Sequence, residues 1–267
     1  MGDCVDVERN VGVARVMMHR GGTNAIAADL MGELKAAFED LGQDPECRVI
    51  VLQSAYERYF SVGADLGNMA GAIDRSAPDA EDQIVHAMRA ERDAFDAIDQ
   101  CPKPVIARLN GHALGGGCEL ALCCDYRLMV EDGRSRIGQT ESALGLIPGA
   151  GGTQRLVRLI GRARALPMLY ESRRLSAADA AAAGLVDRAV APDELDAAVD
   201  EVAGRLVKAA TFALAMIKDA VGRGQDLALA EGLDVEARNF ARAALSEDAL
   251  AGIMAFFQKQ EPEFKGR

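Results

Sequence analysis

Two glutamates lie in apolar, glycine-rich surroundings, where a carboxylate is costly to bury. Glu119 follows three consecutive glycines at residues 115–117, and Glu141 precedes a second glycine-rich run at residues 149–152. Burial would raise the pKa of each carboxyl group toward the range that suits proton transfer near neutral pH. Two carboxylates that share one water molecule suit the addition or elimination of water across a double bond, one as base and the other as acid.

These surroundings also have explanations that involve no chemistry. Glu119 falls in the first turn of a helix predicted at residues 118–124, where a negative charge complements the helix dipole. The glycines before it could present N–H groups to a negative oxygen. An oxyanion hole fits better than a nucleotide-phosphate loop, because neither a GxGxxG pattern nor a P-loop lysine occurs. The turn at residues 60–66, with Gly63 at its bend, could supply another N–H or be an ordinary strand-to-helix turn.

The elements that must position these residues follow from hydrophobic periodicity. Strands are predicted at residues 11–18, 49–53, 105–109, 126–130 and 185–190, and helices at 29–41, 84–98, 118–124, 153–160 and 176–183. This alternation predicts an α/β fold with a largely parallel sheet. From residue 194 onward only helices are predicted, at 195–207, 212–221, 227–244 and 246–258. We therefore expect an α/β core over residues 1–193 and a C-terminal helical segment over residues 194–267.

Composition and charge narrow the class of partner. The net charge of −11, from 30 Lys and Arg against 41 Asp and Glu, disfavours nucleic acids and membrane surfaces. The six cysteines form no CxxC pair and none has zinc spacing with a histidine, so no metal site is expected. Cys118, Cys123 and Cys124 stand in an apolar run that is typical of buried cysteines. Without a signal-like N-terminus or an apolar run of membrane length, we expect a cytoplasmic protein.

Three segments carry a family resemblance: Gly63-Ala64-Asp65, residues 110–119 (NGHALGGGCE) and residues 137–156 (IGQTESALGLIPGAGGTQRL). Together they resemble the motifs of the enoyl-CoA hydratase/isomerase (crotonase) family. The likeness extends from about residue 10 to residue 265 and includes residues 23–26, 175–185 and 254–259. It implies a crotonase-like α/β fold of repeated ββα units with C-terminal oligomerisation helices. It also implies a homotrimer or a dimer of trimers.

The resemblance implies a role for each chemically interesting residue. The backbone N–H groups of Ala64 and Gly116 would form the oxyanion hole for a thioester carbonyl. Glu119 and Glu141 would be the catalytic pair that flanks a water molecule, with Glu119 activating the water and Glu141 delivering a proton to the α-carbon. The N–H of Gly149 would position the water.

Coenzyme A would enter as part of the thioester substrate, with no cofactor permanently bound. The resemblance implies that Ala64, Asp65 and Leu66 line its pocket in the α/β core. The sequence departs from the family pattern at two nearby positions. Gly67 replaces a lysine that helps to hold coenzyme A in many members, and Thr140 stands where the family usually has proline.

Phe256 and Lys259 are predicted to complete the coenzyme A site of a neighbouring subunit. Ser246 is a plausible N-cap for a helix over residues 248–258, so the two residues, three apart, would share a face. A ring beside an ammonium group suits an adenine next to a ribose phosphate, and the glycine at residue 67 makes another cation more necessary. The alternative is that Phe256 is a core anchor and Lys259 is solvated.

The expected function is the hydration of a 2-enoyl-CoA to a 3-hydroxyacyl-CoA, or the reverse dehydration, as in fatty acid metabolism. Two alternatives remain open. Another reaction on the same fold, such as double-bond isomerisation, needs only one proton-shuttling carboxylate. A non-catalytic binding role, for example toward RNA, is disfavoured by the acidic charge and by the lack of a basic stretch interleaved with aromatic residues. Residues 67–94, where the family shapes its acyl pocket, match no family pattern.

Overall fold

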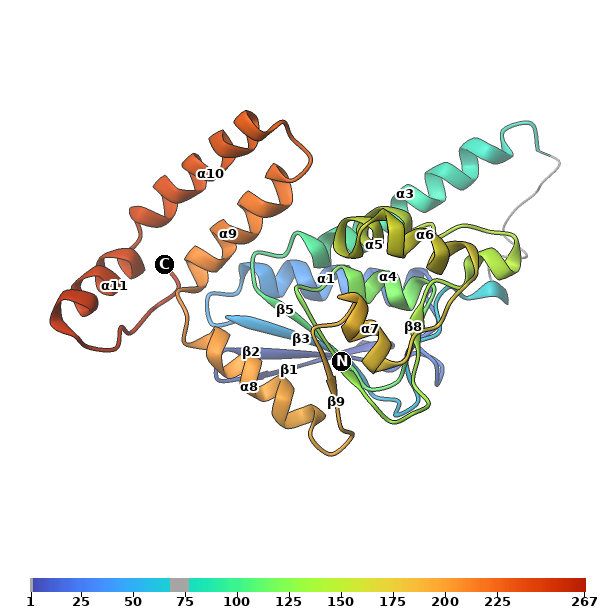
Figure 1. Ribbon diagram of the computed structural model, residues 1–267, viewed down its shortest axis with the longest axis horizontal. Helices are drawn as coiled ribbons and strands as arrows, with labels where there is room; N and C mark the ends of the chain where they lie inside the picture. The colour runs from blue at the N-terminus through green and yellow to red at the C-terminus, as the bar shows by residue number, and fades with distance from the viewer. Residues whose placement is uncertain (1, 68–76) are drawn as a thin grey trace.

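A six-stranded sheet forms the centre of the structure, a computed structural model that describes residues 2–67 and 77–267 (Figure 1). The strand order is β1-β2-β3-β5-β7-β9, with β1 and β2 antiparallel and every other neighbouring pair parallel. The strands are β1 (Val5–Asn10), β2 (Val13–Met18), β3 (Val49–Ser54), β5 (Val105–Leu109), β7 (Tyr126–Val130) and β9 (Arg188–Val190). The predicted α/β fold with a largely parallel sheet is confirmed.

A second, smaller sheet contains three short parallel strands, β4 (Tyr59–Ser61), β6 (His112–Leu114) and β8 (Ile137–Gly138). Each of them directly follows a strand of the large sheet along the chain, which is the repeated two-strand unit that the family resemblance implies. The carboxyl ends of parallel strands meet at one edge. The segments that leave these three strands are therefore brought together, and they include the glycine turn, the glycine triplet and the approach to Glu141.

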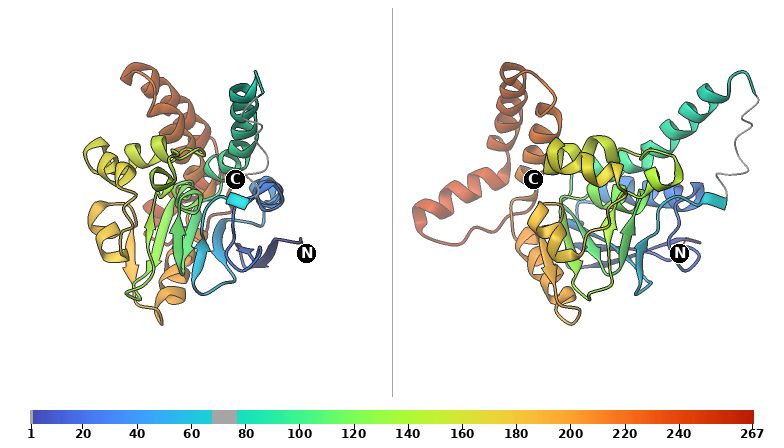
Figure 2. Two further views of the ribbon diagram at one scale, coloured as in Figure 1. Left: turned by 90° about the vertical axis from the view of Figure 1, so that its right-hand side faces the viewer. Right: turned by 45° about the vertical axis from the view of Figure 1, so that its right-hand side comes forward.

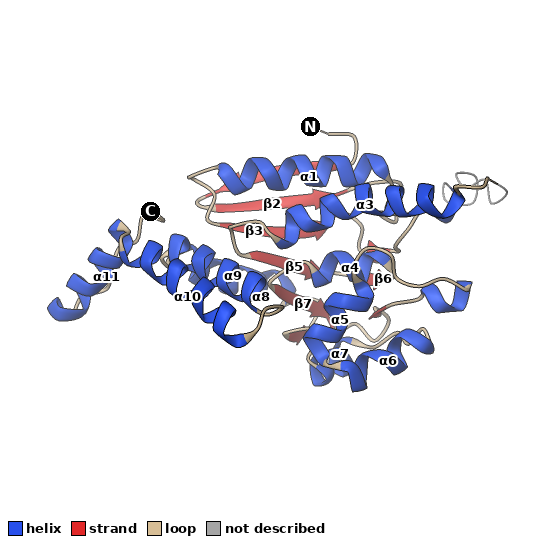
Figure 3. Cartoon of the chain, turned by 90° about the horizontal axis from the view of Figure 1, so that it is seen from above, coloured by secondary structure: helices blue, strands red, loops and turns tan. Residues whose placement is uncertain are grey.

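Helices cover both faces of the large sheet (Figures 1 and 3). On one face, α8 (Leu195–Val207) packs against alternate strand residues such as Val49 and Val51. On the other face, Ile50 and Leu52 pack in the core formed with α1 (Ala28–Gln43), α3 (Ala80–Asp99) and α4 (Gly116–Leu122). Burial on both faces explains why β3 reads as one continuous apolar run.

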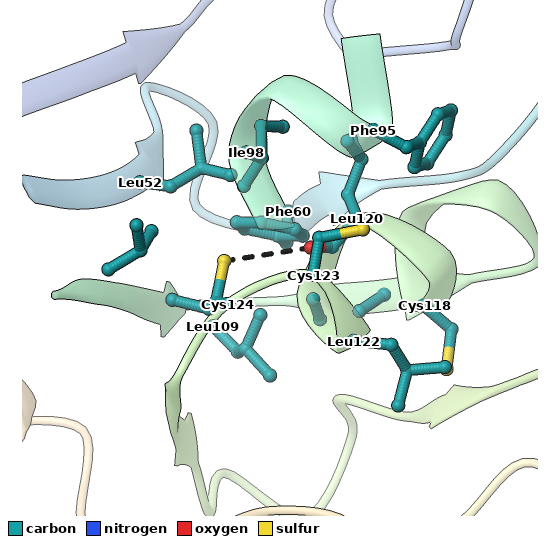
Figure 4. Packing of buried hydrophobic residues seen from close by; sticks show 14 of the residues in the cluster. Leu52, Phe60, Phe95, Ile98, Leu109, Cys118, Leu120, Leu122, Cys123 and Cys124 are labelled. Atoms are coloured by element: carbon teal, nitrogen blue, oxygen red, sulfur yellow. Dashed lines mark hydrogen bonds between the residues drawn. The ribbon is translucent and has the colours of Figure 1, made fainter. Parts of the chain in front are cut away.

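The core beside α4 contains two fully buried phenylalanines, Phe60 and Phe95, packed around the helix (Figure 4). Cys118, Cys123 and Cys124 are buried in the same cluster, and their burial raises the pKa of all three thiols. They are therefore small apolar core residues, as the sequence predicts, and inert at neutral pH. This packing holds α4, the helix that carries Glu119, in a fixed position.

Short helices surround the edge where the small sheet ends. They are the 3-10 helix η1 (Glu141–Leu144), α5 (Gly152–Ile160), α6 (Arg162–Tyr170) and α7 (Ala177–Ala183). The predicted helix at residues 176–183 is confirmed: the Ser176 side chain accepts a hydrogen bond from the N–H of Asp179, and Gly184 ends the helix in the left-handed conformation. Helix α6 is not predicted from the sequence.

The last three helices, α9 (Thr211–Gly224), α10 (Leu229–Ala244) and α11 (Glu247–Gln258), extend away from the sheet (Figure 2). We call residues 211–267 the C-terminal arm. Since α8 packs on the sheet, the outward-projecting part of the C-terminal segment begins at α9; the division at residue 194 into two units stays a prediction. Across the described ranges, no helix is both long and apolar enough to cross a membrane.

The end of the chain is anchored to the start of α11. The Asp248 carboxylate accepts hydrogen bonds from the N–H groups of Lys265 (2.6 Å) and Gly266 (2.8 Å). Arg48 donates to the carbonyl oxygens of Val207 (2.6 Å) and Phe264 (2.5 Å), which connects this tail to the body. These charge-assisted bonds fix the direction in which α11 leaves the molecule.

Candidate active site

The candidate site consists of four segments at the end of the small sheet: residues 63–66, 115–119, 139–141 and 149–152. Glu119 lies in the first turn of α4 and is only 3% exposed. Its Oε1 accepts hydrogen bonds from the N–H groups of Ala150 (2.9 Å) and Gly152 (2.6 Å). Its Oε2 has no hydrogen-bond partner in the part of the chain that the structure describes, so this oxygen can accept a ligand or a water molecule.

The environment of Glu119 tunes its acidity to neutral pH. Burial raises the pKa of Glu119 to about 7, the N–H groups of Gly152 and Ala150 oppose this rise, and the charge of Glu141 reinforces it. A smaller contribution of the same sign comes from Glu91 on α3. A carboxyl group with this pKa exchanges a proton readily under physiological conditions.

Glu141 begins η1 and is half-buried, and burial raises its pKa as well. The glycine triplet allows α4 to approach it closely. Gly115 has φ +53°, and a Cβ at this position would lie 2.9 Å from Oε1 of Glu141. A Cβ at Gly117 would lie 2.3 Å from the carbonyl oxygen of Ser61. The triplet is therefore required by close approach between β4, α4 and Glu141.

Two backbone N–H groups beside the carboxylates have no acceptor within residues 2–67 and 77–267. The bridge between Ile26 and Ala64 uses the carbonyl oxygen of Gly63 (2.8 Å) and the N–H of Asp65 (2.9 Å), which leaves the N–H of Ala64 unused. The N–H of Gly116 heads α4, where no intrahelical acceptor exists. A Cβ at Gly63 would lie 3.0 Å from this nitrogen, so the two donors belong to segments in direct contact.

The remaining predicted residues of the core lie around this centre. Gly149 precedes Ala150, which binds Glu119, and a Cβ at Gly149 would lie 3.0 Å from Sδ of Met88 on α3. Asp65 forms an ion pair with Arg20 (3.2 Å), which holds the turn after β4 to the first loop, and Leu66 is exposed beside it. The structure thus brings together every site residue that the sequence predicts in the α/β core.

Comparison with known proteins identifies the family. A model of the enoyl-CoA hydratase/isomerase family matches residues 8–267. The chain belongs to this family. It is 41% identical to a probable enoyl-CoA hydratase of Rhizobium meliloti. The match covers 91% of this chain and 90% of the relative. It is 34% identical to the crotonyl-CoA hydratase of Syntrophomonas wolfei, with 90% and 89% of the two chains covered.

Solved structures of the enoyl-CoA hydratase/isomerase family share the fold. The crystal structure of the enoyl-CoA hydratase from Bacillus anthracis superposes with a TM-score of 0.90 at 35% identity, covering 99% of this chain and 100% of that one. The crotonase fold with two sheets and C-terminal helices is therefore confirmed. Family membership implies a thioester of coenzyme A as the substrate. In the described part of the chain, no cluster of His, Cys, Asp or Glu side chains could hold a metal ion.

Two predicted residues, Phe256 and Lys259, lie elsewhere, at the end of α11 in the C-terminal arm. Figure 1 shows where this helix lies. Phe256 is 79% exposed and makes an edge-to-face contact with Phe257, with ring centroids 5.7 Å apart. It is therefore not a core anchor of its own chain. Helix α11 ends at Gln258, as predicted, and Lys259 follows it in the left-handed conformation with φ +57°; the shared face of Phe256 and Lys259 stays a prediction.

Two polar residues near the site, Gln139 and Glu91, have no role predicted from the sequence. Gln139, between β8 and Glu141, is 1% exposed and contacts the glutamate. Glu91 is half-buried on α3, and burial raises its pKa. Gln139 could have been noticed as a polar residue inside the motif that contains Glu141. Glu91 lies in the stretch at residues 67–94 that matches no pattern, of which residues 68–76 lie outside the described residues.

Proposed function

We propose that this protein is an enoyl-CoA hydratase, which adds water to a 2-enoyl-CoA thioester or catalyses the reverse dehydration. The observation that carries the proposal is the pairing of Glu119 and Glu141. Burial raises the pKa of both carboxyl groups, and the charge of one raises the pKa of the other. Two carboxyl groups with raised pKa values in one site can divide the work of base and acid between them.

In the proposed reaction Glu119 is the base. Its Oε1 is held by the N–H groups of Ala150 and Gly152, which leaves Oε2 for the water molecule. The N–H of Gly149, the residue before Ala150, would position this water. The carboxylate takes a proton from water while the water oxygen forms a bond to the β-carbon of the enoyl group. The π electrons then move toward the thioester, and the carbonyl oxygen acquires negative charge.

The unused N–H groups of Ala64 and Gly116 would receive that charge. These two donors are already oriented, so no reorganisation is needed when the oxyanion forms. They therefore stabilise the enolate more than they stabilise the substrate carbonyl. The Glu141 carboxyl group then delivers its proton to the α-carbon, and the enolate electrons form the new C–H bond. One proton leaves Glu141 and one arrives at Glu119, so the sum is the addition of one water molecule.

The names of similar proteins support this reaction over isomerisation. Crotonyl-CoA hydratase of Syntrophomonas wolfei and the probable hydratase of Rhizobium meliloti are both named as hydratases. Isomerisation would move one proton and needs a single carboxylate, whereas this chain keeps two in one site. We also propose that the chain forms a homotrimer or a dimer of trimers and that Phe256 and Lys259 complete the coenzyme A site of a neighbouring subunit.

The test is a panel of 2-enoyl-CoA esters of increasing chain length, with loss of absorbance at the enoyl-thioester band as the readout. We expect turnover with at least one straight-chain ester and identification of the 3-hydroxyacyl-CoA by mass. If 3-enoyl-CoA esters are converted to 2-enoyl-CoA while none is hydrated, the protein is an isomerase. If no ester reacts and the protein is retained on heparin, the binding role replaces the enzymatic one.

A further inference from the structure

Gln139 joins the two halves of the candidate site. It lies in the loop between β8 and η1 and is 1% exposed, so its amide cannot be satisfied by bulk water. Three acceptors surround the end of its side chain: Oε1 and Oε2 of Glu141 at 3.2 Å each, and the carbonyl oxygen of Gly115 at 3.3 Å. An amide oxygen placed there would face three other oxygens. The amide nitrogen therefore faces them and donates.

The bond to Gly115 reaches the peptide that carries one of the unused N–H groups. The carbonyl of Gly115 and the N–H of Gly116 belong to the same peptide unit, so fixing the carbonyl fixes the direction of the N–H. The carbonyl also accepts the N–H of Glu119 at 3.0 Å. Donation to a carbonyl polarises its peptide, which makes the N–H a stronger donor.

The bond to Glu141 acts on the proton donor. Amide donation to both carboxylate oxygens favours the ionised form of the group. That form appears as Glu141 transfers its proton to the α-carbon, so the interaction strengthens as the reaction proceeds. The amide is also packed tightly: a Cβ at Gly152 would lie 2.9 Å from Cδ of Gln139. Little room remains for Gln139 to turn away from Glu141.

We propose that Gln139 is a positioning residue that holds the Glu141 carboxylate and the Gly115–Gly116 peptide in one arrangement. Proton delivery to the α-carbon and stabilisation of the enolate oxygen then act on the same substrate geometry. This inference rests on the proposed hydratase function. In this role Gln139 does not contact the substrate. It fixes the position of the Glu141 carboxylate relative to the N–H of Gly116, and these two groups contact the substrate.

The test is Gln139→Met, which keeps the volume and removes the donor. A charge-assisted hydrogen bond that strengthens in the transition state predicts a fall in kcat of about 10–100-fold. KM for the enoyl-CoA should change less than about threefold, because the thioester contacts remain. Gln53→Met is the matched control: Gln53 is half-buried on β3, its amide accepts a bond from Arg15 at 3.3 Å, and its loss should leave kcat at the parental value.

A double-mutant cycle separates positioning from a general loss of structure. In a Glu141→Gln background, Gln139→Met should lower kcat by less than about threefold, because one of its two partners no longer ionises. An equal loss in both backgrounds would overturn the proposal, as would parental kcat in Gln139→Met itself. If Gln139→Met does not fold, as judged by circular dichroism, Gln139→Asn withdraws the same amide by one methylene and is expected to lower kcat in the same direction; parental kcat there would overturn it as well.

Failure of the proposed function is distinguishable from failure of this inference. If the parent protein hydrates no enoyl-CoA, the hydratase proposal falls, but Gln139 can still be tested. The assay is the exchange of the α-hydrogens of a saturated acyl-CoA for deuterium, measured by nuclear magnetic resonance. This exchange requires Glu141 and the two N–H donors, but it requires no attack by water. Slower exchange in Gln139→Met than in Gln53→Met supports the positioning role, and equal exchange removes it.

Discussion

The candidate site and the C-terminal arm place their energetically costly groups in different environments. In the site, Glu119 is a buried carboxylate, but N–H groups of its own chain bind it, and Gln139 holds its partner Glu141. In the arm, apolar side chains such as Phe240 and Phe257 are largely exposed among the residues that the structure describes. The cost in the site is offset within one subunit, whereas the cost in the arm can be offset only by another molecule.

The largest effect is expected when the carboxylates are neutralised. Glu119→Gln and Glu141→Gln should each lower kcat for hydration by about 10²–10⁴-fold, because each removes a general acid or base. The affinity for acyl-CoA should remain close to that of the parent. The fold decrease in kcat of the double variant should be far smaller than the product of the two single decreases. Steady-state kinetics with a 2-enoyl-CoA measures both values. Glu236→Gln, an exposed glutamate on α10, is the control from the arm and should be silent. Near-normal turnover in either site variant would falsify the pair.

Substitutions in the arm are expected to change the molecular mass of the assembly and not the rate of the chemical step. Light scattering of the parent protein should give a mass of three or six chains, and Phe240→Glu should shift the distribution toward the monomer by placing a charge in an apolar contact. Val11→Glu changes another exposed apolar residue, in the β1–β2 turn, and should leave the mass unchanged. A parent protein that is already monomeric at micromolar concentration would contradict the assembly.

The buried carboxylate should also affect the pH dependence of stability. The pKa of Glu119 is raised to about 7 in the folded state from an ordinary value of 4.5, so the folded state binds the proton more tightly than the unfolded state does. Stability contributed by the neutral group is therefore lost as pH rises from about 4.5 to about 7. Glu119→Gln should be more stable than the parent at pH 8, by up to about 3 kcal/mol, and nearly equal to it at pH 4.5.

Urea unfolding at one fixed protein concentration measures this difference. Glu236→Gln should show no such pH-dependent gain, because its side chain is exposed in the arm. A Glu119→Gln variant that is less stable than the parent at pH 8 would mean that the N–H groups of Ala150 and Gly152 depend on a charged acceptor.

The smallest expected effect tests whether the arm reaches into a neighbouring site. Lys259→Ala should reduce the discrimination between coenzyme A and coenzyme A without its 3′-phosphate by about tenfold, or roughly 1–2 kcal/mol, the value of a charge-assisted hydrogen bond. Lys208→Ala, an exposed lysine at the end of α8, is the matched control. Isothermal titration with both ligands gives the ratio. If Lys259→Ala binds both ligands as tightly as the parent does, Lys259 is only a surface charge.

Much of the site is predictable because its signals are local. The glycine triplet and the two glutamates each stand out in a short window of sequence, and the family motifs relate them to one another. Strand β3 of the large sheet is predictable for the same reason, since it is a nearly continuous apolar run. By contrast, β4, β6 and β8 have two or three residues each, which is too short for any periodicity, although they determine where the site forms.

The unpredicted features depend on contacts between distant segments. Gln139 acquires its partners from Gly115, just before α4, and from Glu141 in η1, and its position inside the Glu141 motif does not indicate the contact with Gly115. Strand β1 is missed because only Val5 and Val7 mark it among charged neighbours, and its pairing with β2 determines its conformation. The left-handed conformation of Lys259 is missed because glycine, the usual signal for such a helix end, is absent there.

The position of the arm at the end of the chain has a consequence for biosynthesis. The last strand of the large sheet ends at Val190 and the helix that covers its face ends at Val207, so every residue of the sheet and the candidate site leaves the ribosome before α9 begins. Domains fold in the order of synthesis at the pace of translation. The body of each chain can therefore fold before the exposed apolar side chains of the arm are synthesised. In the proposed trimer, chains made on one messenger RNA would present these side chains only after their bodies are synthesised, which would limit association between unfinished chains.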